Sequence, residues 1–312
     1  MSSQLSLKLL KIVRLNVELT TKTGLLISGG RALGRIGGSD IEPMSVEREY
    51  ACEGDQNKKI TVRVPYIPGS SLKGRMRSLL EVALGLPLYS SDRKIWAHIM
   101  ARGIFKDLAG TRITDEEFVK ALKDTPLDRL FGYGAFPIRE LQDGLKNKQE
   151  LAELLKVLTP TALLVEDLFP SKGYVCDIYK RNGLVTFDDF IEDKGENRID
   201  RVTSAADPRE VSRVKPGVPF TGTISLLVFD KNANSVKEFL NLLTKGMTLL
   251  EKTYLGAYGS RGYGRVEFTS IDVSVYDPQA NKETKFKEKP LNSVEELAKE
   301  IDNLIKLITQ QS

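Results

Sequence analysis

A glycine-rich polar segment at residues 28–43 carries an isolated carboxylate that could take part in phosphodiester chemistry. Asp40 is the only acidic residue between Glu18 and Glu42, and Arg31 and Arg35 precede it. A carboxylate in this setting can hold a divalent metal ion or help a hydroxyl attack a phosphodiester, while the arginines can contact phosphates. The alternative is that Asp40 only makes a surface loop more soluble. Long loops in compact domains are usually either functional or disordered, so the length of this segment fits both interpretations.

A second candidate site is a basic run that joins a predicted strand to a predicted helix. Residues 58–80 contain no acid and six basic residues, namely Lys58, Lys59, Arg63, Lys73, Arg75 and Arg77. The helix start at Ser70 and Ser71 is expected to offer an N-cap, unpaired N–H groups and the positive end of the helix dipole. This combination favours phosphate binding, and a solvated basic helix face is the alternative.

The segment Gly69–Met76 also resembles the phosphate-binding loop GxxxxGK[ST] of nucleotide hydrolases. The resemblance fails at the two residues that contact the nucleotide. Arg75 stands where the lysine would reach the terminal phosphates, and Met76 has no hydroxyl for Mg²⁺. Nucleotide hydrolysis is therefore disfavoured.

A third candidate is the glycine-rich segment at residues 256–265, GAYGSRGYGR, which follows a predicted helix and precedes a predicted strand. A dinucleotide-binding turn has the opposite order, so that function is excluded. The glycines allow a backbone to approach a ligand closely, and Tyr258, Arg261 and Tyr263 supply rings and a cation. This mixture suits single-stranded nucleic acid, and an ordinary glycine-rich turn is the alternative.

Composition limits the remaining chemistry. The 312 residues include 46 Lys and Arg, 42 Asp and Glu and a single histidine, so the net charge is +4. Only His98 could complete a Ser-His-Asp triad, and its position between Trp96 and Met100 indicates helix packing instead. Cys52 and Cys176 are too few for a four-thiolate metal cluster or a disulfide framework, so a reducing cytoplasm is expected.

Other features carry less information. The acidic run Asp188, Asp189, Glu192 and Asp193 is typical of a solvated surface, and Asp167 at a strand end is expected to be a structural cap. Lys8, Lys11 and Arg14 interrupt the apolar N-terminus, so we expect no export signal, and no stretch is apolar enough to span a membrane.

Hydrophobic periodicity predicts an α+β protein with a mostly antiparallel sheet. Strands are predicted at 8–21, 59–66, 161–168, 173–179, 218–230 and 265–275, and helices at about 71–84, 235–252 and 293–309. Residues 28–58 and 181–216 are predicted to be two long polar excursions, and residues 86–158 to be mainly helical.

Three blocks of sequence, in this order along the chain, resemble the signature segments of the RAMP superfamily. They are YIPGSSLKGRMRSLLE, ENRIDRVTSAADPREV and YLGAYGSRGYGRVEF, and the resemblance spans most of residues 8–275. The chain is most similar to the Csm-type backbone subunits of type III CRISPR effector complexes. The resemblance implies a ferredoxin-like (RRM-like) core from residues 1–85 and 159–276 and a thumb at about 181–216. It says little about the other two segments, which the sequence pattern predicts to be a mainly helical insertion at 86–158 and a tail with a helix at 277–312.

The resemblance also implies roles for individual residues. The basic helix (Ser70, Ser71, Lys73, Arg75 and Arg77) and the glycine-rich loop (Gly259, Ser260, Arg261 and Tyr263) would bind the backbone of the guide, crRNA. Arg31, Arg35 and the thumb residues Arg201 and Arg209 would also contact RNA. Residues 36–40, Ile-Gly-Gly-Ser-Asp, match the family's Ile-Gly-x-x-Asp, which assigns target-RNA cleavage to Asp40 with Mg²⁺ or Mn²⁺.

The implied partners are crRNA, target RNA and other Csm- or Cmr-type subunits, with no membrane and no organic cofactor. One departure is that Leu26 follows Thr23-Gly24-Leu25 where members often have histidine. Two alternatives stay open: a non-catalytic RNA-binding paralogue in the same complex, and a guide-processing ribonuclease. The second would have only His98 as an imidazole acid-base group.

Overall fold

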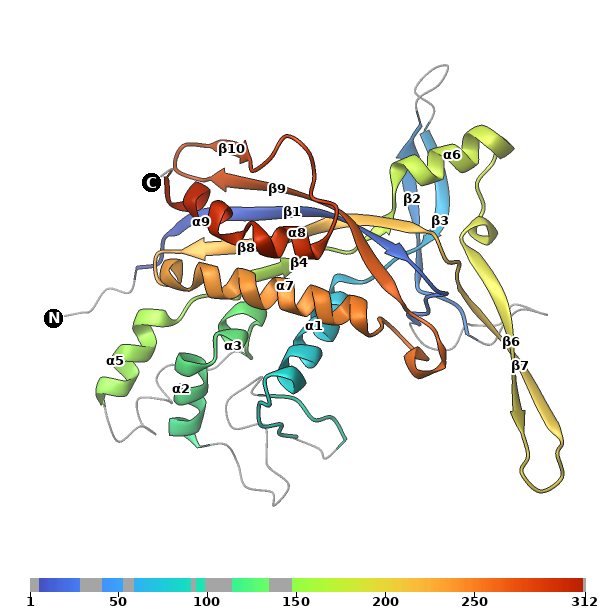
Figure 1. Cartoon of the computed structure of the whole chain (residues 1–312), viewed down its shortest axis with the longest axis horizontal. Coiled ribbons are helices and arrows are strands. Elements are labelled where there is room, and N and C mark those ends of the chain that lie inside the picture. Colours follow the sequence, from blue (N-terminus) through green and yellow to red (C-terminus); the bar gives the residue numbers. More distant parts are fainter. Residues whose placement is uncertain are drawn as a thin grey trace.

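A six-stranded antiparallel sheet forms the centre of the molecule. The computed structural model describes residues 6–28, 41–52, 59–90, 94–98, 114–134 and 148–310. The strand order is β10-β9-β1-β8-β4, and β5 also pairs with β8 (Figure 1). The strands are β1 (Leu9–Thr21), β4 (Leu163–Val165), β5 (Phe169–Pro170), β8 (Pro219–Phe229), β9 (Val266–Asp277) and β10 (Lys282–Lys285).

The connections between these strands define a ferredoxin-like core. Helix α1 (Gly69–Ala83) lies between β1 and β4 in sequence, and α7 (Val236–Lys252) lies between β8 and β9. The elements β1, α1, β4, β8, α7 and β9 form the βαββαβ pattern, with the strands in the spatial order β9-β1-β8-β4. The predicted α+β class with a ferredoxin-like antiparallel sheet is therefore confirmed.

One face of this sheet packs against helices. Alternating apolar residues of β1 and β8 are buried; these are Val13, Leu15, Val17 and Leu19, and Phe220, Ile224, Leu226 and Val228. They share one core with Leu72, Met76 and Leu80 of α1 and with apolar residues of α7. Helices α1, α7 and α8 lie on the same side of the sheet (Figure 1). Alternation along the strands places their polar residues on the other face.

The inserted and C-terminal segments add helices around this core. Helices α2 (Asp115–Asp124), α3 (Pro126–Phe131) and α5 (Lys148–Val157) lie in the 86–158 segment, where α2 and α5 share a small apolar cluster. In the tail, α8 (Val294–Lys299) and α9 (Ile301–Gln310) add buried residues to the main core. Among the described residues, no helix has both the length and the apolar character that crossing a membrane would require.

Two hairpins lie outside the central sheet. Strand β2 (Ser45–Ala51) pairs with β3 (Lys59–Pro65), which corrects the prediction that residues 28–58 form one long loop. Strands β6 (Ile191–Ile199) and β7 (Ala206–Val214) form a second two-stranded sheet that extends away from the body (Figure 1). We call this β6–β7 hairpin the thumb; Arg201 is exposed in the turn at its tip.

The predicted strand at 173–179 is wrong, because the segment forms helix α6 (Lys172–Asn182). The Ser171 side chain accepts a hydrogen bond from the Tyr174 N–H, and Gly183 ends the helix in the left-handed conformation, with φ of 72°. Val175, Cys176 and Ile178 form its buried side. The residues that cap this helix, Ser171 and Gly183, lie outside the predicted strand at 173–179. The periodicity of so short a segment does not distinguish a strand from a helix, and the caps decide it.

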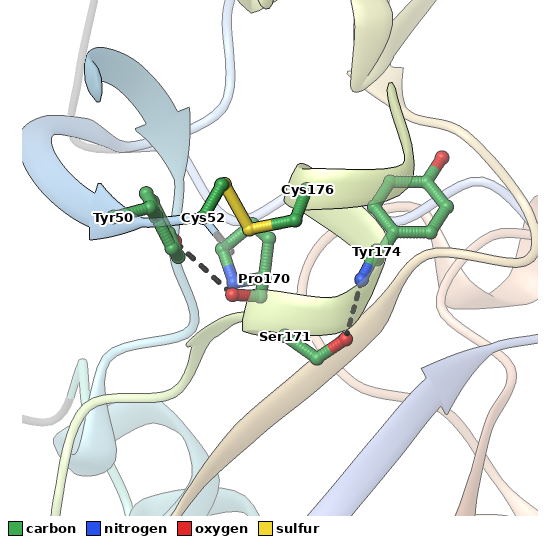
Figure 2. Close-up of a disulfide and its surroundings, with 6 residues drawn as sticks. All are labelled: Tyr50, Cys52, Pro170, Ser171, Tyr174 and Cys176. Carbon is green, nitrogen blue, oxygen red and sulfur yellow. Dashed lines mark hydrogen bonds between the residues drawn. A yellow bond between two sulfur atoms is a disulfide. The ribbon is translucent and has the colours of Figure 1, made fainter. Parts of the chain in front are cut away.

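The two cysteines form a disulfide bond that the sequence analysis did not anticipate. Cys52 at the end of β2 and Cys176 on α6 are joined with their Cα atoms 5.3 Å apart (Figure 2). The bond links positions 124 residues apart and attaches the β2–β3 hairpin to the helix that precedes the thumb. Two cysteines are too few for a disulfide framework, but they are enough for one long-range cross-link.

Candidate functional site

The glycine-rich loop folds into a tight structure over the end of α7. Gly259–Arg261 form one 3₁₀ turn, η3, and Tyr258 before it adopts a left-handed conformation with φ of 57°. A Cβ atom at Gly259 would lie 2.0 Å from the Tyr254 ring, and one at Gly264 would lie 2.0 Å from the Leu255 carbonyl oxygen. Close approach of the loop backbone to a ring at Gly259, and to another part of the backbone at Gly264, therefore explains these two glycines. Ser260 and Arg261 remain exposed on the turn.

Tyr263 attaches this loop to the thumb. Its ring is completely buried and packs with Leu26 and Val211, and its hydroxyl donates a 2.8 Å hydrogen bond to Glu196 Oε1 on β6. Burial, followed by the neighbouring Glu196 carboxylate, raises the pKa of Tyr263 to about 12. The prediction that Tyr263 contacts RNA is therefore wrong: a buried ring cannot stack on a base, and the residue connects two binding elements instead.

Three cations from the thumb and one from the loop itself lie close to two tyrosines of the loop. The guanidinium of Arg213 lies 4.5 Å from the centre of the Tyr263 ring, and the Lys194 ammonium lies 4.6 Å from it. Arg209 and Arg261 both lie over the Tyr258 ring, at 5.6 and 5.0 Å. Cations held near ring faces are stabilised by the ring quadrupole. The loop and the thumb therefore form one basic and aromatic surface.

Glu196 organises this surface from the thumb side. Its Oε2 accepts a 2.7 Å hydrogen bond from Arg209 Nη2, and its Oε1 accepts the Tyr263 hydroxyl. The hydrogen bond from Arg209, followed by that from Tyr263, lowers the pKa of Glu196. The carboxylate is therefore ionised at neutral pH and fixes one side of Arg209.

Both described ends of the first long loop meet the same surface. On the N-terminal side, Leu25 forms a bridge with Val214 at the end of β7. On the C-terminal side, the Ile41 carbonyl accepts a 3.2 Å hydrogen bond from the Ser212 N–H on β7. Asp40, Arg31 and Arg35 lie outside the described residues, so their predicted roles stay predictions. The chain nonetheless enters and leaves their segment beside the thumb.

Helix α1 contributes Arg75 to the edge of this surface. Arg75 Nε donates a 3.0 Å hydrogen bond to the Tyr254 carbonyl, and the guanidinium lies 4.2 Å from the centre of the Tyr254 ring. The same ring contacts Gly259, so Arg75 adjoins the glycine-rich loop. Lys73 is turned elsewhere, because its Nζ donates to the Leu163 carbonyl, and burial followed by the charge of Arg77 lowers its pKa.

The predicted anion site at the start of α1 is already filled by the protein. The Gly69 N–H donates a 2.8 Å hydrogen bond to Asp167 Oδ1, and the Ser71 and Leu72 N–H groups bond to the Pro68 carbonyl. Pro68 is the N-cap residue, without a side-chain cap, so the predicted N-cap role of Ser70 and Ser71 is wrong. The prediction that Asp167 is a structural cap is confirmed. A phosphate at this helix end would compete with its carboxylate.

Arg77 is an interior residue and not part of an RNA-binding surface. It is 9% exposed, and its guanidinium forms 2.8 Å ion pairs with Glu81 on α1 and Asp128 on α3. Its Nη1 also donates to the Gly132 carbonyl at 2.6 Å. The predicted contact between Arg77 and guide RNA is therefore wrong, since the side chain is directed between two helices.

Two basic residues of the 58–80 run on β3 pair with acids outside the run. Lys59 pairs with Glu49 at 2.8 Å, and Arg63 pairs with Glu42 at 3.2 Å. Arg63 also lies 4.4 Å from the centre of the Phe187 ring. Lys58 lies outside the described residues. Together with Arg77, three of the five described basic residues of this run therefore have acidic partners in the folded protein.

His98 joins the buried ion cluster around Arg77. Its Nδ1 contacts the Pro87 carbonyl at 2.8 Å, and its Nε2 lies 3.3 Å from Asp128 Oδ2. Burial lowers the pKa of His98, but the Asp128 carboxylate, the Pro87 carbonyl and Glu81 together raise it above its ordinary value. The predicted helix-packing role is replaced by a place in a buried cluster of charged groups, which favours the protonated form of His98.

We expect this arrangement to make unfolding pH-dependent. A histidine whose pKa is raised by folding stabilises the protein fully below its unfolded pKa of about 6.5, and the contribution is lost as pH rises through the folded value. The melting temperature of the wild type should therefore fall relative to that of His98→Gln between about pH 6 and pH 8. Parallel pH profiles for the two proteins would show that His98 does not change its charge on folding.

The sheet face opposite the helices is unsuited to RNA. A shallow hollow on this face is lined by Asn16, Val17, Glu18, Arg48, Glu166, Thr221, Gly222, Thr223, Ser270 and Asp272. RRM domains bind bases on aromatic residues of the sheet. This hollow instead presents three carboxylates against one arginine, and no aromatic ring lines it. The surface formed by the thumb and the glycine-rich loop is therefore the better candidate for RNA.

Sequence reasoning missed two thumb cations, Lys194 and Arg213, and the role of Tyr254. Residues 209, 211 and 213 alternate as Arg, Val and Arg, and residues 194 and 196 are Lys and Glu. Residues two apart on a strand point to the same face, so this spacing would place these five side chains on one face of a hairpin. A search for residues of like character spaced two apart in the polar 181–216 segment could therefore have found the hairpin.

These features define an α+β protein with a ferredoxin-like core and a basic and aromatic surface where a thumb meets a glycine-rich loop. The family model of the RAMP superfamily matches residues 18–267, so the chain belongs to this superfamily. The "CRISPR system Cms endoribonuclease Csm3" of Methanothermobacter thermautotrophicus is 30% identical over 82% of this chain and 83% of its own length. The protein of the same description from Enterococcus italicus is 30% identical over 85% of this chain and 94% of its own.

The fold also has a relative among solved structures. The crystal structure of Methanopyrus kandleri Csm3 aligns with 96% of this chain and 98% of its own, at 18% identity and a TM-score of 0.50. At this identity the likeness concerns the fold alone.

Proposed function

We propose that this protein is a backbone subunit of a type III CRISPR effector complex in the cytoplasm, which binds crRNA and cleaves complementary target RNA at regular intervals. The observation that carries the proposal is the joint surface of the thumb and the glycine-rich loop, at which both ends of the Asp40 segment are anchored. The resemblance to proteins described as Csm3 endoribonucleases supports the enzymatic part. We propose the domain division expected from the sequence, with a core at 1–85 and 159–276, an insertion at 86–158 and a tail at 277–312.

In this proposal, the glycine-rich turn and Arg75 bind the phosphates of the guide. Ser260 and Arg261 are exposed there, and Arg75 lies beside them against Tyr254. Arg209 and Arg201 on the thumb contact the guide–target duplex, and Ser70 and Ser71 at the start of α1 contact the guide backbone. The proposed partners are crRNA, target RNA, further copies or paralogues of this subunit and other Csm- or Cmr-type subunits.

Asp40 would be the catalytic residue and the protein ligand of Mg²⁺ or Mn²⁺. No group of three or more histidine, cysteine or acidic residues that could hold a metal occurs in the part of the chain that the structure describes. Mg²⁺ is often bound by one or two carboxylates and by oxygens of the substrate phosphates, so a single aspartate fits such a site. When bound, the ion would supply Lewis-acid activation of the scissile phosphate.

We expect the double variant Arg75→Ala/Arg261→Ala to weaken guide RNA binding without regard to sequence. Each lost contact with a single-strand phosphate should reduce the slope of log K against log salt by about 0.7, so the variant should lose about 1.4. Fluorescence anisotropy with labelled RNA at several salt concentrations measures the slope. The matched control is Lys120→Ala/Lys156→Ala, which removes the same charge from exposed positions on α2 and α5.

An unchanged slope in the first variant, or an equal loss in the control, would contradict the proposed surface. Target cleavage by the assembled complex then separates the two alternatives from the main proposal. A non-catalytic paralogue would bind guide RNA normally and show no dependence on Asp40. A guide-processing ribonuclease would cleave precursor RNA as an isolated chain.

A further inference from the structure

The Cys52–Cys176 disulfide joins the hairpin that follows the Asp40 segment to the helix that precedes the thumb. Cys52 comes directly after β2, and Cys176 lies on α6, which leads through η1 (Phe187–Asp189) into the thumb (Figures 1 and 2). The bond therefore links elements next to the two segments that carry the candidate RNA-binding and catalytic residues.

The β2–β3 hairpin and α6 both contribute to the main apolar core, through Tyr50, Val62 and Val64 on the hairpin and Val175 and Ile178 on α6, and the hairpin also contacts β5. The hairpin is a two-stranded sheet that does not join the central sheet, and such hairpins are marginally stable alone. Near the disulfide, the Tyr50 hydroxyl donates a 3.1 Å hydrogen bond to the Pro170 carbonyl (Figure 2), and Arg48 lies 3.8 Å from the centre of the Phe169 ring. Most residues of α6 are exposed or half-exposed, so its buried side is small.

The same hairpin also touches the base of the thumb. Arg63 on β3 lies over the ring of Phe187 in η1. Lys215, just after β7, donates hydrogen bonds to the carbonyls of Asp188 and Asp189 in η1, at 2.9 and 3.2 Å. Movement of the hairpin or of α6 would therefore reach both strands of the thumb through η1.

We propose that the Cys52–Cys176 disulfide is a covalent brace of the working protein, which holds the β2–β3 hairpin on α6 and so fixes the base of the thumb. The bond forms when the two thiols lose one hydrogen each. By exchange, the two electrons and the two protons pass to a disulfide of a small molecule or another protein, whose S–S bond breaks to give two thiols. The cysteines are 4% and 6% exposed, so a reductant reaches the bond only after local opening.

The first test is the thiol content of the full chain. Cells are lysed in denaturant with iodoacetamide and no reductant, and the intact mass of the chain is measured. We expect Cys52 and Cys176 to escape alkylation until dithiothreitol is added. Complete alkylation of both cysteines without reductant would overturn the proposal.

The second test separates the brace from ordinary packing. Dithiothreitol should lower the melting temperature of the oxidised wild type by roughly 5 °C, because a long loop in the unfolded chain is no longer closed. It should leave Cys52→Ala/Cys176→Ala unchanged. Hydrogen exchange after reduction should rise in β2, β3, α6 and the thumb strands, while β1, β9 and α7 stay protected. No melting shift, or exchange that rises equally everywhere, would overturn the brace.

The effect on activity rests on the proposed function. In the assembled complex, Cys52→Ala/Cys176→Ala should slow target cleavage several-fold while guide RNA binding stays at the wild-type level. Equal cleavage rates for the oxidised and the reduced wild-type complex would overturn the proposal that the disulfide positions the thumb. If the oxidised wild-type complex does not cleave target RNA at all, the proposed function is wrong. Thiol content and hydrogen exchange still test separately whether the disulfide braces the hairpin and α6.

Discussion

Asp40→Ala is expected to remove target-RNA cleavage while leaving guide and target binding intact. A group that holds a catalytic metal ion or assists the attacking hydroxyl contributes roughly 10²–10⁴-fold to the rate. Binding should persist because the thumb, the glycine-rich turn and Arg75 do not depend on this carboxylate. The single histidine of the chain is buried in an ion cluster on the other side of α1, so it cannot replace the carboxylate.

The measurement is single-turnover cleavage of end-labelled target RNA by the assembled complex with Mg²⁺. Asp124→Ala is the matched control, because Asp124 is an exposed carboxylate at the end of α2, remote from the thumb (Figure 1). The control should cleave at the wild-type rate and with the same spacing of products. An unchanged cleavage pattern in Asp40→Ala would exclude the catalytic assignment and favour the non-catalytic paralogue.

Arg77→Ala is expected to be among the most destabilising substitutions on α1. The guanidinium lies between Glu81 and Asp128, which are 4% and 0% exposed. Removing one partner of a buried charge cluster leaves uncompensated carboxylates and typically costs about 3–5 kcal/mol. This is a large share of the roughly 5–15 kcal/mol that stabilises a typical domain. The variant should therefore have a much lower unfolding midpoint.

Urea unfolding followed by circular dichroism measures this loss. Arg75→Ala is the matched control, because it removes the same kind of side chain two residues away, from a partly exposed position over Tyr254. We expect the control to cost about 1 kcal/mol or less. If the stability of Arg77→Ala equals that of the control and its RNA binding falls, Arg77 belongs to the binding surface after all.

The different roles of these two arginines could not be predicted from the sequence. Arg75 and Arg77 belong to one basic run and lie on one predicted helix, and no local property separates them. Their different roles depend on what packs against each side of α1. Asp128, 51 positions further along the chain, comes into contact with Arg77, whereas Tyr254 and the glycine-rich loop meet Arg75. Partners so distant in sequence leave no periodic signal.

The role of Tyr263 also depends on residues that are distant in the sequence. A tyrosine in a glycine- and arginine-rich loop predicts stacking on a base, yet its hydroxyl bonds to Glu196 and its ring is buried. The choice between stacking and packing depends on the thumb, which folds back over the loop. The disulfide is similar, because the 124 residues between the cysteines hide their proximity.

Local pattern in the sequence predicts the regular elements of this protein. Alternating apolar residues identified the main strands of the core, and helical spacing identified α1 and α7. The order of these elements indicated an α+β protein with a mostly antiparallel sheet, and the resemblance to the RAMP superfamily implied the ferredoxin-like topology. Motif spacing also pointed to the segments that meet at the candidate site. Only the tertiary structure decided which cations remain at the surface, that Asp167 fills the start of α1, and that the two cysteines pair. The physical reason is that charge neutralisation and burial arise from contacts between residues far apart in the chain, which folding alone brings together.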